Sequence, residues 1–388
     1  MDALEKLRLL GPATCYEPAE EMPLRQPAAP RTVDDLSRCI YHAVLPGGKR
    51  IALLKTLLTS ACERDCLYCA FRRGRDAPRA TFSPEELARL FIQMHERGLV
   101  QGIFLSSGIA GGGARTEDLL IDTAEILRRR YGFRGYIHLK IMPGAEREQV
   151  VAAMRLANRV SVNLEAPNPE RLARLCPHKS FYEELFERLK WIAQVRRSEP
   201  GRWPSATTQF VVGAAGESDR EILRMTEYLL RELGLARAYF SRFEPIPGTP
   251  LEAYPPTPAL REHRLYESSF LLRDYGFSVD DLPFDESGNL PLDTNPKLAW
   301  ARKYLLETPV EVNTASREEL LRVPGIGPVG ADNILRARTQ GTLRDLSDLR
   351  KLGIRADQAA PFVLLAGRRP ARQLPLWPTS HSDKEAKP

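Results

Sequence analysis

The chain has 388 residues and a formal net charge of +6, with 56 lysines and arginines against 50 aspartates and glutamates. At about 150 residues per domain, this length predicts two or three domains. The hydrophobic fraction of 43% is ordinary for a globular protein, and six cysteines are too few for a disulfide scaffold. No apolar run reaches the roughly 18 residues of a membrane span, and we expect no secretory signal.

Short apolar segments alternate with segments of helical period from residue 51 onward, about every 30 residues, which is the length of one β–α unit. The predicted strands are 51–60, 102–107, 136–142, 160–165, 207–213 and 236–243. Because these segments are apolar almost throughout, both faces of the sheet should be buried, which indicates an α/β fold with a parallel sheet. The chemistry of such folds lies in the loops after the carboxyl ends of the strands.

The helical segments carry start and stop signals. In the segment 83–98, Ser83 is the expected N-cap, Pro84 takes the first helical position and Gly98 ends the helix. Residues 1–45 are irregular, with a short helical pattern at 34–41. The predicted domains are an N-terminal extension at 1–45, a core at 46–255, a proline-rich connector at 256–305, a module of short helices at 306–368 and a disordered tail at 369–388.

Three cysteines follow the first predicted strand with the spacing CxxxCxxC: Cys62, Cys66 and Cys69. A structural zinc site takes four protein ligands, usually as two CxxC pairs, and the sequence has no second pair. A zinc loop completed by His42 or Cys39, or incidental clustering, are the alternatives. A four-iron cluster held by three cysteines leaves one iron open to another ligand, which indicates a functional centre.

This spacing, with the aromatic Tyr68 before the last cysteine, resembles the radical S-adenosylmethionine (SAM) superfamily. The resemblance extends over residues 50–250 and implies a partial (β/α)6 TIM-like barrel that holds a [4Fe-4S] cluster. It also implies that SAM chelates the open iron and that an external electron donor reduces the cluster. SAM is then cleaved to a 5′-deoxyadenosyl radical, which abstracts hydrogen from a substrate.

Polar residues after the second and fourth strands match cofactor-binding positions of that superfamily. Ser106, Ser107 and Gly108 stand at the glycine-rich turn that binds the methionine amino group, where many members have Gly-Gly-Glu. The missing acid leaves hydroxyls or backbone carbonyls to bind that group. Asn163 and Glu165 stand where members contact the ribose or methionine. Since a buried acid needs a partner, a structural salt bridge is the alternative for Glu165.

The loop after the fifth predicted strand resembles the superfamily's backbone site for adenine, with Gly213, Gly216 and Glu217. The alternative is an ordinary glycine loop before a helix that begins near Glu217 or Ser218. The segment FEPIPGTPL at 243–251 resembles the part of the chain that closes the barrel in many members.

An arginine-rich loop follows the cysteines and contains Arg72, Arg73, Arg75 and Arg79. Either this is a solvated basic loop, or it forms a positively charged rim that guides DNA to the mouth of the barrel. Of the scattered cysteines, Cys15 and Cys39 are expected to be reduced thiols. Cys176 is also expected to be an inert thiol, with the alternative of a radical partner or an extra ligand beside His178.

The segment 310–338 predicts two helices joined by a tight hairpin. The first helix begins at Thr314 or Ser316 and runs to Arg322, and the second begins at Pro328. The hairpin between them is formed by Pro324, Gly325, Ile326 and Gly327. Glycines allow the backbone to approach a ligand, and N–H groups at a helix N-terminus suit a phosphate.

This segment resembles the helix-hairpin-helix motif, which binds the DNA backbone without reading its sequence, and a degenerate second hairpin follows at 351–354. Residues 306–372 hold 11 basic and 8 acidic side chains, so the net charge is 11 − 8 = +3. That charge is modest for a DNA-binding module, so backbone donors should carry much of the binding, which should be weak and salt-sensitive. Packing or protein contacts are the alternative use of the module.

The tail contains a short apolar peptide with Gln373, Leu374, Leu376 and Trp377. It resembles the peptide by which bacterial replication and repair proteins bind the sliding clamp, although Pro375 departs from the usual pattern. Exposed leucine and tryptophan in a polar tail are otherwise unfavourable.

The whole chain resembles a bacterial group described as DNA modification or repair radical SAM proteins, which accompany a uracil-DNA-glycosylase-like protein. The resemblance implies a cytoplasmic enzyme that acts on a nucleotide in DNA. Because a base inside a duplex is inaccessible, the substrate should be flipped, damaged or single-stranded. The alternatives are a radical SAM enzyme for RNA or tRNA, and a non-catalytic Fe-S scaffold that recruits the glycosylase-like partner.

Overall fold

The computed structural model describes residues 1–11, 39–44, 50–199 and 201–370. The chain divides into two compact units: Met1–Ser269 with Phe284–Leu292, and Phe270–Pro283 with Asp293–Pro388. The division falls inside helix α8 (Ala259–Asp274). No helix in the described ranges is long and apolar enough to cross a membrane.

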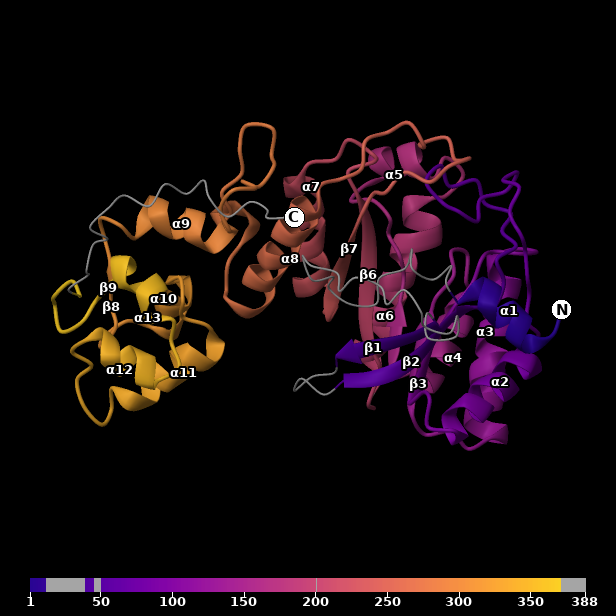
Figure 1. Ribbon diagram of the computed structural model, residues 1–388, viewed down its shortest axis with the longest axis horizontal. Coiled ribbons are helices and arrows are strands. Elements are labelled where there is room, and N and C mark those ends of the chain that lie inside the picture. Colours follow the sequence, from indigo (N-terminus) through magenta and orange to yellow (C-terminus); the bar gives the residue numbers. More distant parts are fainter. Residues whose placement is uncertain (12–38, 45–49, 200, 371–388) are drawn as a thin grey trace, which may run out of the picture. The chain divides into compact units, whose positions relative to one another are not determined.

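The first unit is built on one curled sheet whose seven strands lie side by side in the order of the sequence (Figure 1). The strands are β1 (Ile40–Val44), β2 (Arg50–Leu57), β3 (Gly102–Ser106), β4 (Tyr136–Lys140), β5 (Arg159–Ser161), β6 (Ser205–Val212) and β7 (Arg237–Arg242). From β2 to β7 every neighbouring pair is parallel. The predicted partial (β/α)6 barrel and its six strands are confirmed, and the carboxyl ends of all six strands lie at one edge.

Strand β1 was not predicted. It pairs antiparallel with β2, with Ile40 opposite Leu54 and Ala43 opposite Ile51. The helical pattern predicted at 34–41 is therefore wrong for Ile40 and Tyr41, and its residues 34–38 lie outside the described residues. The reason is tertiary: Ala43 and Ile51 pack in one apolar cluster, and this packing overrides a weak local preference.

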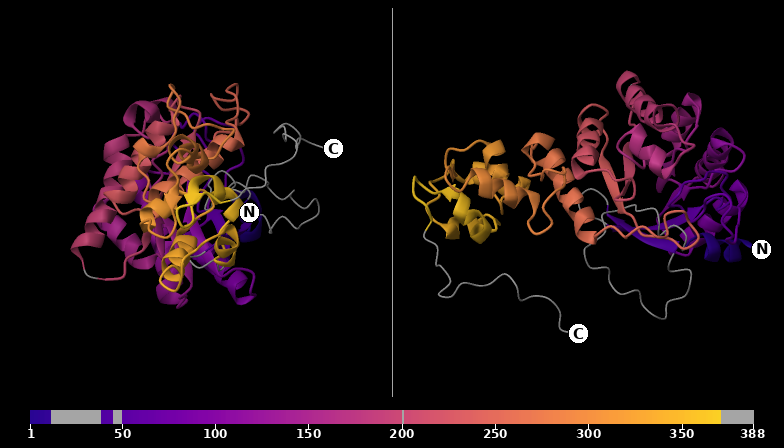
Figure 2. Two further views of the ribbon diagram at one scale, coloured as in Figure 1. Left: turned by 90° about the vertical axis from the view of Figure 1, so that its left-hand side faces the viewer. Right: turned by 90° about the horizontal axis from the view of Figure 1, so that it is seen from above.

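Helices connect the parallel strands and cover the outer face of the sheet (Figure 2). They are α2 (Pro84–Glu96), α3 (Gly113–Glu125) with the π-helical turn Ile126–Arg130, α4 (Arg147–Leu156), α5 (Pro169–Leu175), the π-helical turn Phe181–Phe186 with α6 (Glu187–Ser198), and α7 (Asp219–Arg231). An additional helix, α1 (Ala3–Leu10), precedes the sheet. Ser83 caps α2 by accepting the Glu86 N–H, and the Glu86 carboxylate accepts the Ser83 N–H, which confirms the predicted start.

The second unit is a small helical module with its own apolar core. Its elements are the 3-10 turn Val279–Asp281, α9 (Pro296–Tyr304), β8 (Val310–Glu311), α10 (Arg317–Arg322), α11 (Pro328–Ala337), α12 (Leu346–Lys351), α13 (Ala356–Ala359), the 3-10 turn Ala360–Phe362 and β9 (Val363–Leu364). Ala301 and Leu305, from the segment predicted as a connector, are buried in the same core as Ile326 and Ile334. Part of that segment therefore belongs to the helical module.

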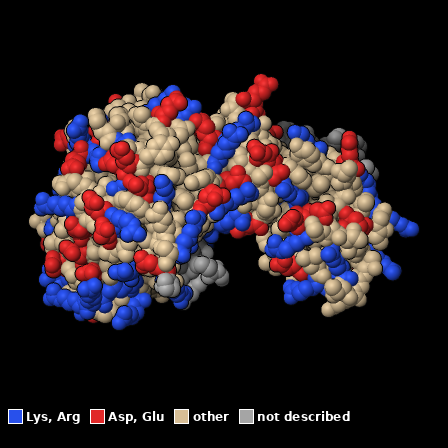
Figure 3. All heavy atoms as spheres, turned by 180° about the vertical axis from the view of Figure 1, so that it is seen from behind, with Lys and Arg blue, Asp and Glu red and all other residues tan. Residues whose placement is uncertain are grey.

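Charges of both signs are mixed on the surface. On the face drawn in Figure 3, lysine and arginine side chains lie among aspartate and glutamate side chains over each unit. This pattern agrees with the small net charge of the sequence. Attraction to a polyanion would therefore depend on particular local groups.

Candidate functional site

A cavity of about 680 Å³ lies in the first unit, at the carboxyl ends of the parallel strands. The sequence-predicted residues that line it are Cys62, Cys66, Tyr68, Cys69, Ser107, Gly108, Asn163 and Glu165. Ser106 is fully buried at the end of β3, and its side chain does not line the cavity. The volume is within the range of sites for small molecules and cofactors. The topology thus brings together residues that are about 100 positions apart.

The cysteine loop is held against the glycine-rich turn after β3. Gly108 donates its N–H to the Thr59 carbonyl at 2.8 Å, and Glu63 donates its N–H to the Ile109 carbonyl at 2.8 Å. A Cβ at Gly108 would lie 2.5 Å from the Ala61 carbonyl oxygen. Glycine is therefore required at this position because the two backbones approach too closely for any side chain.

Glu63 extends this contact with its side chain. Its carboxylate accepts the N–H of Gly111 at 3.0 Å and that of Gly112 at 3.1 Å. Both glycines have positive φ, 75° and 94°, a conformation that other residues rarely adopt. The role of Glu63 was missed from the sequence, although an acid between two motif cysteines was a visible signal.

Arg79 organises the interior of the cysteine loop. Its guanidinium donates hydrogen bonds to the carbonyl oxygens of Ser60, Phe71, Arg72 and Arg75. Carbonyls in a loop without regular structure need such donors when they are withdrawn from water. Arg79 therefore shapes the loop that carries the cysteines.

The three arginines predicted to bind DNA differ in exposure. Arg72 donates to the Asp65 carbonyl at 3.5 Å, and Arg75 donates to the Pro247 carbonyl at 3.2 Å. The Arg73 side chain is 62% exposed and lies 3.9 Å from the Asp65 carboxylate. Arg73 is therefore the one of the three that mainly faces solvent, and a role of this loop in DNA binding stays a prediction.

Two of the three thiols accept backbone hydrogen bonds. Cys62 Sγ accepts the Ile109 N–H and Cys69 Sγ accepts the Phe71 N–H, both at 3.4 Å. Hydrogen bonds of this kind stabilise thiolates and tune the potential of iron–sulfur clusters. Burial, in contrast, raises the pKa of Cys69 to about 12, so a positive partner is needed to hold its thiolate.

The third thiol, Cys66, is hydrogen-bonded to Cys176, which is fully buried. This bond, together with the positive charge of Lys179, lowers the pKa of Cys66 to about 6. Cys176 does not line the cavity itself. In the described part of the chain, no three thiol, imidazole or carboxylate groups stand grouped as a ready metal site, although all three motif cysteines line the same cavity.

Glu165 has an unusual conformation for a buried acid. Its φ is 64°, in the left-handed region, and the residue is 5% exposed. One carboxylate oxygen, Oε1, lies 3.4 Å from the Lys179 ammonium, while Oε2 is buried with no hydrogen-bond partner in the described residues. Both backbone strain and an orphan acceptor cost free energy, and such costs concentrate at functional sites.

Lys179 lies in the loop after α5, lines the cavity and has a side chain that is 8% exposed. Burial opposes its charged form, but Cys176, Cys66 and Glu165 together raise its pKa well above the usual value. Lys179 was not predicted as a site residue, because a lysine in a loop is ordinarily solvated. Glu165 forms the salt bridge that was its alternative and also lines the cavity. Its predicted contact with SAM stays a prediction.

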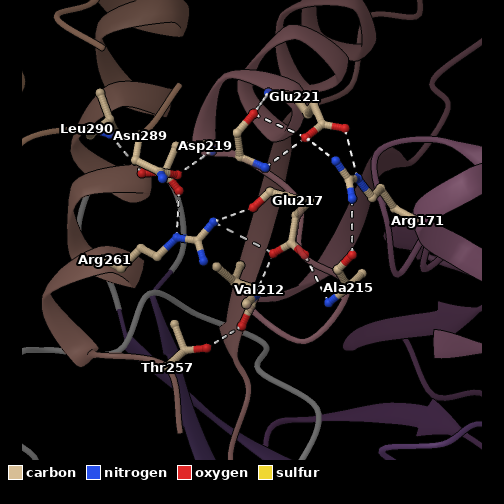
Figure 4. Close-up of polar contacts among 12 residues, drawn as sticks. Arg171, Val212, Ala215, Glu217, Asp219, Glu221, Thr257, Arg261, Asn289 and Leu290 are labelled. Atoms are coloured by element: carbon tan, nitrogen blue, oxygen red, sulfur yellow. Dashed lines mark hydrogen bonds and ion pairs between the residues drawn. The ribbon is translucent and has the colours of Figure 1, made fainter. Parts of the chain in front are cut away.

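The loop predicted to bind adenine is braced by its own residues (Figure 4). The Glu217 carboxylate accepts the N–H groups of Gly213 and Ala215, and Arg261 points between the carboxylates of Glu217 and Asp219. Gly216 also has a positive φ, of 69°. These residues are not among those that line the cavity, and adenine binding by Gly213, Gly216 and Glu217 stays a prediction.

The predicted hairpin of the second unit joins α10 to α11. Ser316 caps α10, and Pro328 is the first residue of α11, as expected. Gly325 has a φ of 85°, and a Cβ there would lie 2.5 Å from the Arg355 carbonyl oxygen. The hairpin from Pro324 to Gly327 is therefore confirmed as a structure that only glycine permits at its turn.

A second hairpin follows, where Gly353 joins α12 to α13 with a φ of 79°, and this geometry agrees with the degenerate repeat predicted at 351–354. The peptide predicted to bind a clamp, with Gln373, Leu374, Leu376 and Trp377, lies outside the described residues.

Residues 56–229 match the family model described as Radical SAM superfamily, and residues 307–362 match the Helix-hairpin-helix motif. The segment 56–229 thus resembles a radical SAM domain. This match covers the cysteine loop and strands β3 to β6, and it supports the predicted enzyme class and its two cofactors, a [4Fe-4S] cluster and SAM.

Several solved structures resemble parts of the chain at low sequence identity. Methylornithine synthase (PylB) is 15% identical, with a TM-score of 0.45 over 57% of this chain and 62% of that one. The FeFe-hydrogenase maturase HydG from Carboxydothermus hydrogenoformans is 16% identical, with a TM-score of 0.46 over 57% and 51%. The methyltransferase TsrM from Kitasatospora setae is 14% identical, with a TM-score of 0.45 over 81% and 64%. The chain thus spans between about half and two thirds of the length of each.

The residues of the radical SAM domain fit these cofactors chemically. Three cysteines line the cavity, and three thiolates are the number that a four-iron cluster with one open iron takes. Two buried atoms that line the same cavity, Glu165 Oε2 and Ser107 Oγ, have no partner in the described residues. A ligand with amino and hydroxyl groups would supply the donors that these atoms lack.

Proposed function

We propose that the chain is a radical SAM enzyme that modifies or repairs a nucleotide in DNA. The observation that carries the proposal is the single cavity in which the three motif cysteines meet the strained, buried Glu165. In a purely structural site, a buried carboxylate oxygen such as Glu165 Oε2 would be expected to have a hydrogen-bond partner.

In this proposal Cys62, Cys66 and Cys69 hold the cluster, and Tyr68, Ser106, Ser107, Gly108, Asn163 and Glu165 hold SAM, with the loop of Gly213, Gly216 and Glu217 at its adenine. When bound, the two cofactors supply a one-electron cleavage of SAM to a radical that abstracts hydrogen.

The chain's own residues position these groups. Glu165 is fixed by Lys179 through one oxygen and offers the other oxygen to a donor on the ligand. Asn163 donates to the Gln209 side-chain oxygen at 3.2 Å, which orients its own oxygen. Of the three motif cysteines only Cys66 is buried, and Cys62 and Cys69 are half-buried.

DNA is proposed as the substrate because of the hairpin in the second unit. Its exposed backbone N–H groups suit a phosphate and contribute no base specificity. The target base would have to be flipped, damaged or single-stranded to reach a cavity of this kind. Arg72, Arg73 and Arg75 are proposed as additional contacts with DNA.

Three further partners complete the proposal: an external electron donor, a uracil-DNA-glycosylase-like protein, and a sliding clamp bound by Gln373, Leu374, Leu376 and Trp377. The clamp contact is tested by replacing Leu376 and Trp377 with alanine. We expect clamp binding to be lost in a pull-down with purified clamp, and unchanged binding would remove this part of the proposal.

The proposed reaction is tested by anaerobic incubation of the reconstituted protein with SAM and dithionite. We expect 5′-deoxyadenosine to form, to increase when single-stranded or damaged DNA is added, and to disappear in Cys69→Ala. Cys39→Ala is the matched control, because Cys39 is a buried cysteine outside the cavity. No 5′-deoxyadenosine above the Cys69→Ala background would leave only the scaffold alternative, and stimulation by tRNA instead of DNA would favour the RNA alternative.

A further inference from the structure

Lys297 contacts the hairpin from a segment that lies outside the matched helix-hairpin-helix residues. It occupies the first turn of α9, and its ammonium donates a hydrogen bond to the Ile326 carbonyl at 2.6 Å. The same ammonium lies 4.5 Å from the centre of the Tyr275 ring, a distance typical of a cation–π contact. Lys297, Tyr275 and Ile326 all belong to the second unit. The turn that is proposed to bind phosphate therefore has a cation held directly against its backbone.

The carbonyl that Lys297 binds is part of the same peptide group as the Gly327 N–H. A charged donor on a carbonyl oxygen polarises its peptide group and makes the attached N–H a stronger donor. In the described part of the chain the Gly327 N–H has no acceptor of its own, and those of Val329 and Gly330, in the first turn of α11, are likewise open. These three N–H groups are the ones that a phosphate would meet.

We propose that Lys297 is a positioning residue for the DNA backbone, whose ammonium strengthens the phosphate-binding N–H groups of the hairpin through the Ile326–Gly327 peptide. This inference rests on the proposed binding of DNA by the hairpin and adds to it a specific source of positive charge. It also gives the predicted connector a function, since α9 carries the lysine.

The surroundings of Lys297 make its charge sensitive to pH. Burial lowers the pKa of Lys297 to about 7, and no described acidic side chain forms an ion pair with it. Tyr275, which contacts the ammonium, has a pKa raised by burial and by the charge of Asp274 and lowered in part by Arg355. A bound phosphate would favour the charged lysine, so binding should take up a proton above neutral pH.

The test measures binding of a fluorescent single-stranded oligonucleotide to the full chain by anisotropy, at pH 6 and pH 9 and constant ionic strength. We expect the wild-type affinity to fall as the pH rises, by at most about tenfold per pH unit. The Lys297→Met variant should bind roughly tenfold more weakly than the wild type at pH 6, and its affinity should be the same at pH 6 and pH 9. Lys297→Arg should retain affinity at pH 9, since its guanidinium stays charged.

The matched control is Lys303→Met, which removes the same charge from the exposed side of the same helix. This variant should bind with nearly the wild-type affinity, reduced only slightly by the loss of one charge. Its affinity should depend on pH as in the wild type. Thermal unfolding midpoints verify that each variant is folded, and a Lys297→Met protein that fails to fold leaves Lys297→Arg and the wild-type pH profile as the test.

Two results would overturn the inference: a wild-type affinity that does not change between pH 6 and pH 9, or a folded Lys297→Met variant with wild-type affinity and pH profile. Failure of the proposed DNA binding is distinguishable, because then the wild-type chain would not bind the oligonucleotide at either pH.

Discussion

At the level of single residues, the site contains groups whose conformation or burial lowers the stability of the fold. Glu165 is buried with a φ of 64° and leaves one oxygen without a partner in the described residues. Lys179 compensates its charge at 3.4 Å and also acts on the Cys66 thiol. A protein retains such an arrangement where the surrounding structure over-determines it, which is typical of a ligand-binding site.

Lys179→Met tests this pairing. Removing one partner of a buried ion pair leaves an uncompensated charge, which typically costs about 3–5 kcal/mol. We therefore expect a large fall in the thermal unfolding midpoint of the cofactor-free protein. The double variant Lys179→Met with Glu165→Gln should recover part of that loss, because it leaves no unpaired carboxylate. A Lys179→Met variant as stable as the wild type would show that the Lys179 ammonium does not stabilise the buried Glu165 carboxylate.

The buried carboxyl group of Glu117 should make the free energy of unfolding depend on pH. It is fully buried in α3, its Oε2 accepts the Met142 N–H at 2.8 Å, and burial raises its pKa to about 8. Since the carboxyl is protonated in the fold but ionised in the unfolded chain between pH 4.5 and pH 8, the folded state binds the extra proton in this window. The free energy of unfolding should therefore decrease as the pH rises from 4.5 to 8.

Glu117→Gln removes this titration and keeps an acceptor for the Met142 N–H. We expect the variant to be more stable than the wild type at pH 8, by on the order of 2 kcal/mol, and close to it at pH 5. Unfolding midpoints at the two pH values measure the difference. The exposed Glu96→Gln is the control and should show the wild-type profile; an identical profile for Glu117→Gln would contradict the prediction.

At the scale of elements, glycines and caps fix the loops on which the function depends. Gly108 permits the cysteine loop to approach the turn after β3, and Gly325 permits the hairpin. Both positions were predicted from motifs, because a glycine required by close backbone approach is conspicuous in a sequence. The structural roles of Glu63, Arg79 and Lys297 were not predicted, since each consists of hydrogen bonds to backbone groups that the spacing of the motifs does not reveal.

The same distinction explains what the sequence could and could not predict of the fold. The parallel strands were predicted because apolar runs and helix caps are local signals, and Ser83 and Ser316 are examples. Strand β1 was missed because its pairing with β2 is decided by tertiary contacts of Ala43 and Ile51. Lys179 was missed because its burial depends on the position of the loop after α5 over the cavity.

Gly325→Ala tests the hairpin. The added Cβ would meet the Arg355 carbonyl at 2.5 Å in a backbone with a φ of 85°, which should cost about 1–3 kcal/mol and distort the turn. We expect oligonucleotide binding to fall at least tenfold while formation of 5′-deoxyadenosine without DNA is retained. Gly341→Ala is the control, because a Cβ there meets no atom within 4 Å and its φ is not positive. Equal binding by the two variants would contradict a role of the hairpin in DNA binding.

The whole molecule combines two units with different chemistry. The first contains the segment that matches the radical SAM superfamily, and the second contains the segment that matches the helix-hairpin-helix motif. The first unit explains how hydrogen could be abstracted, and the second explains how a nucleic acid could be held without reading its sequence. Neither unit alone indicates a modification of DNA, so the central claim depends on both acting on one substrate.

The measurement that tests this claim most directly is the mass of the nucleosides recovered from DNA after anaerobic incubation with the full chain, SAM and a reductant. We expect a nucleoside of altered mass in single-stranded or damaged DNA, which should be absent with Cys69→Ala and less abundant with Lys297→Met. DNA of unchanged mass in the presence of active SAM cleavage would contradict it.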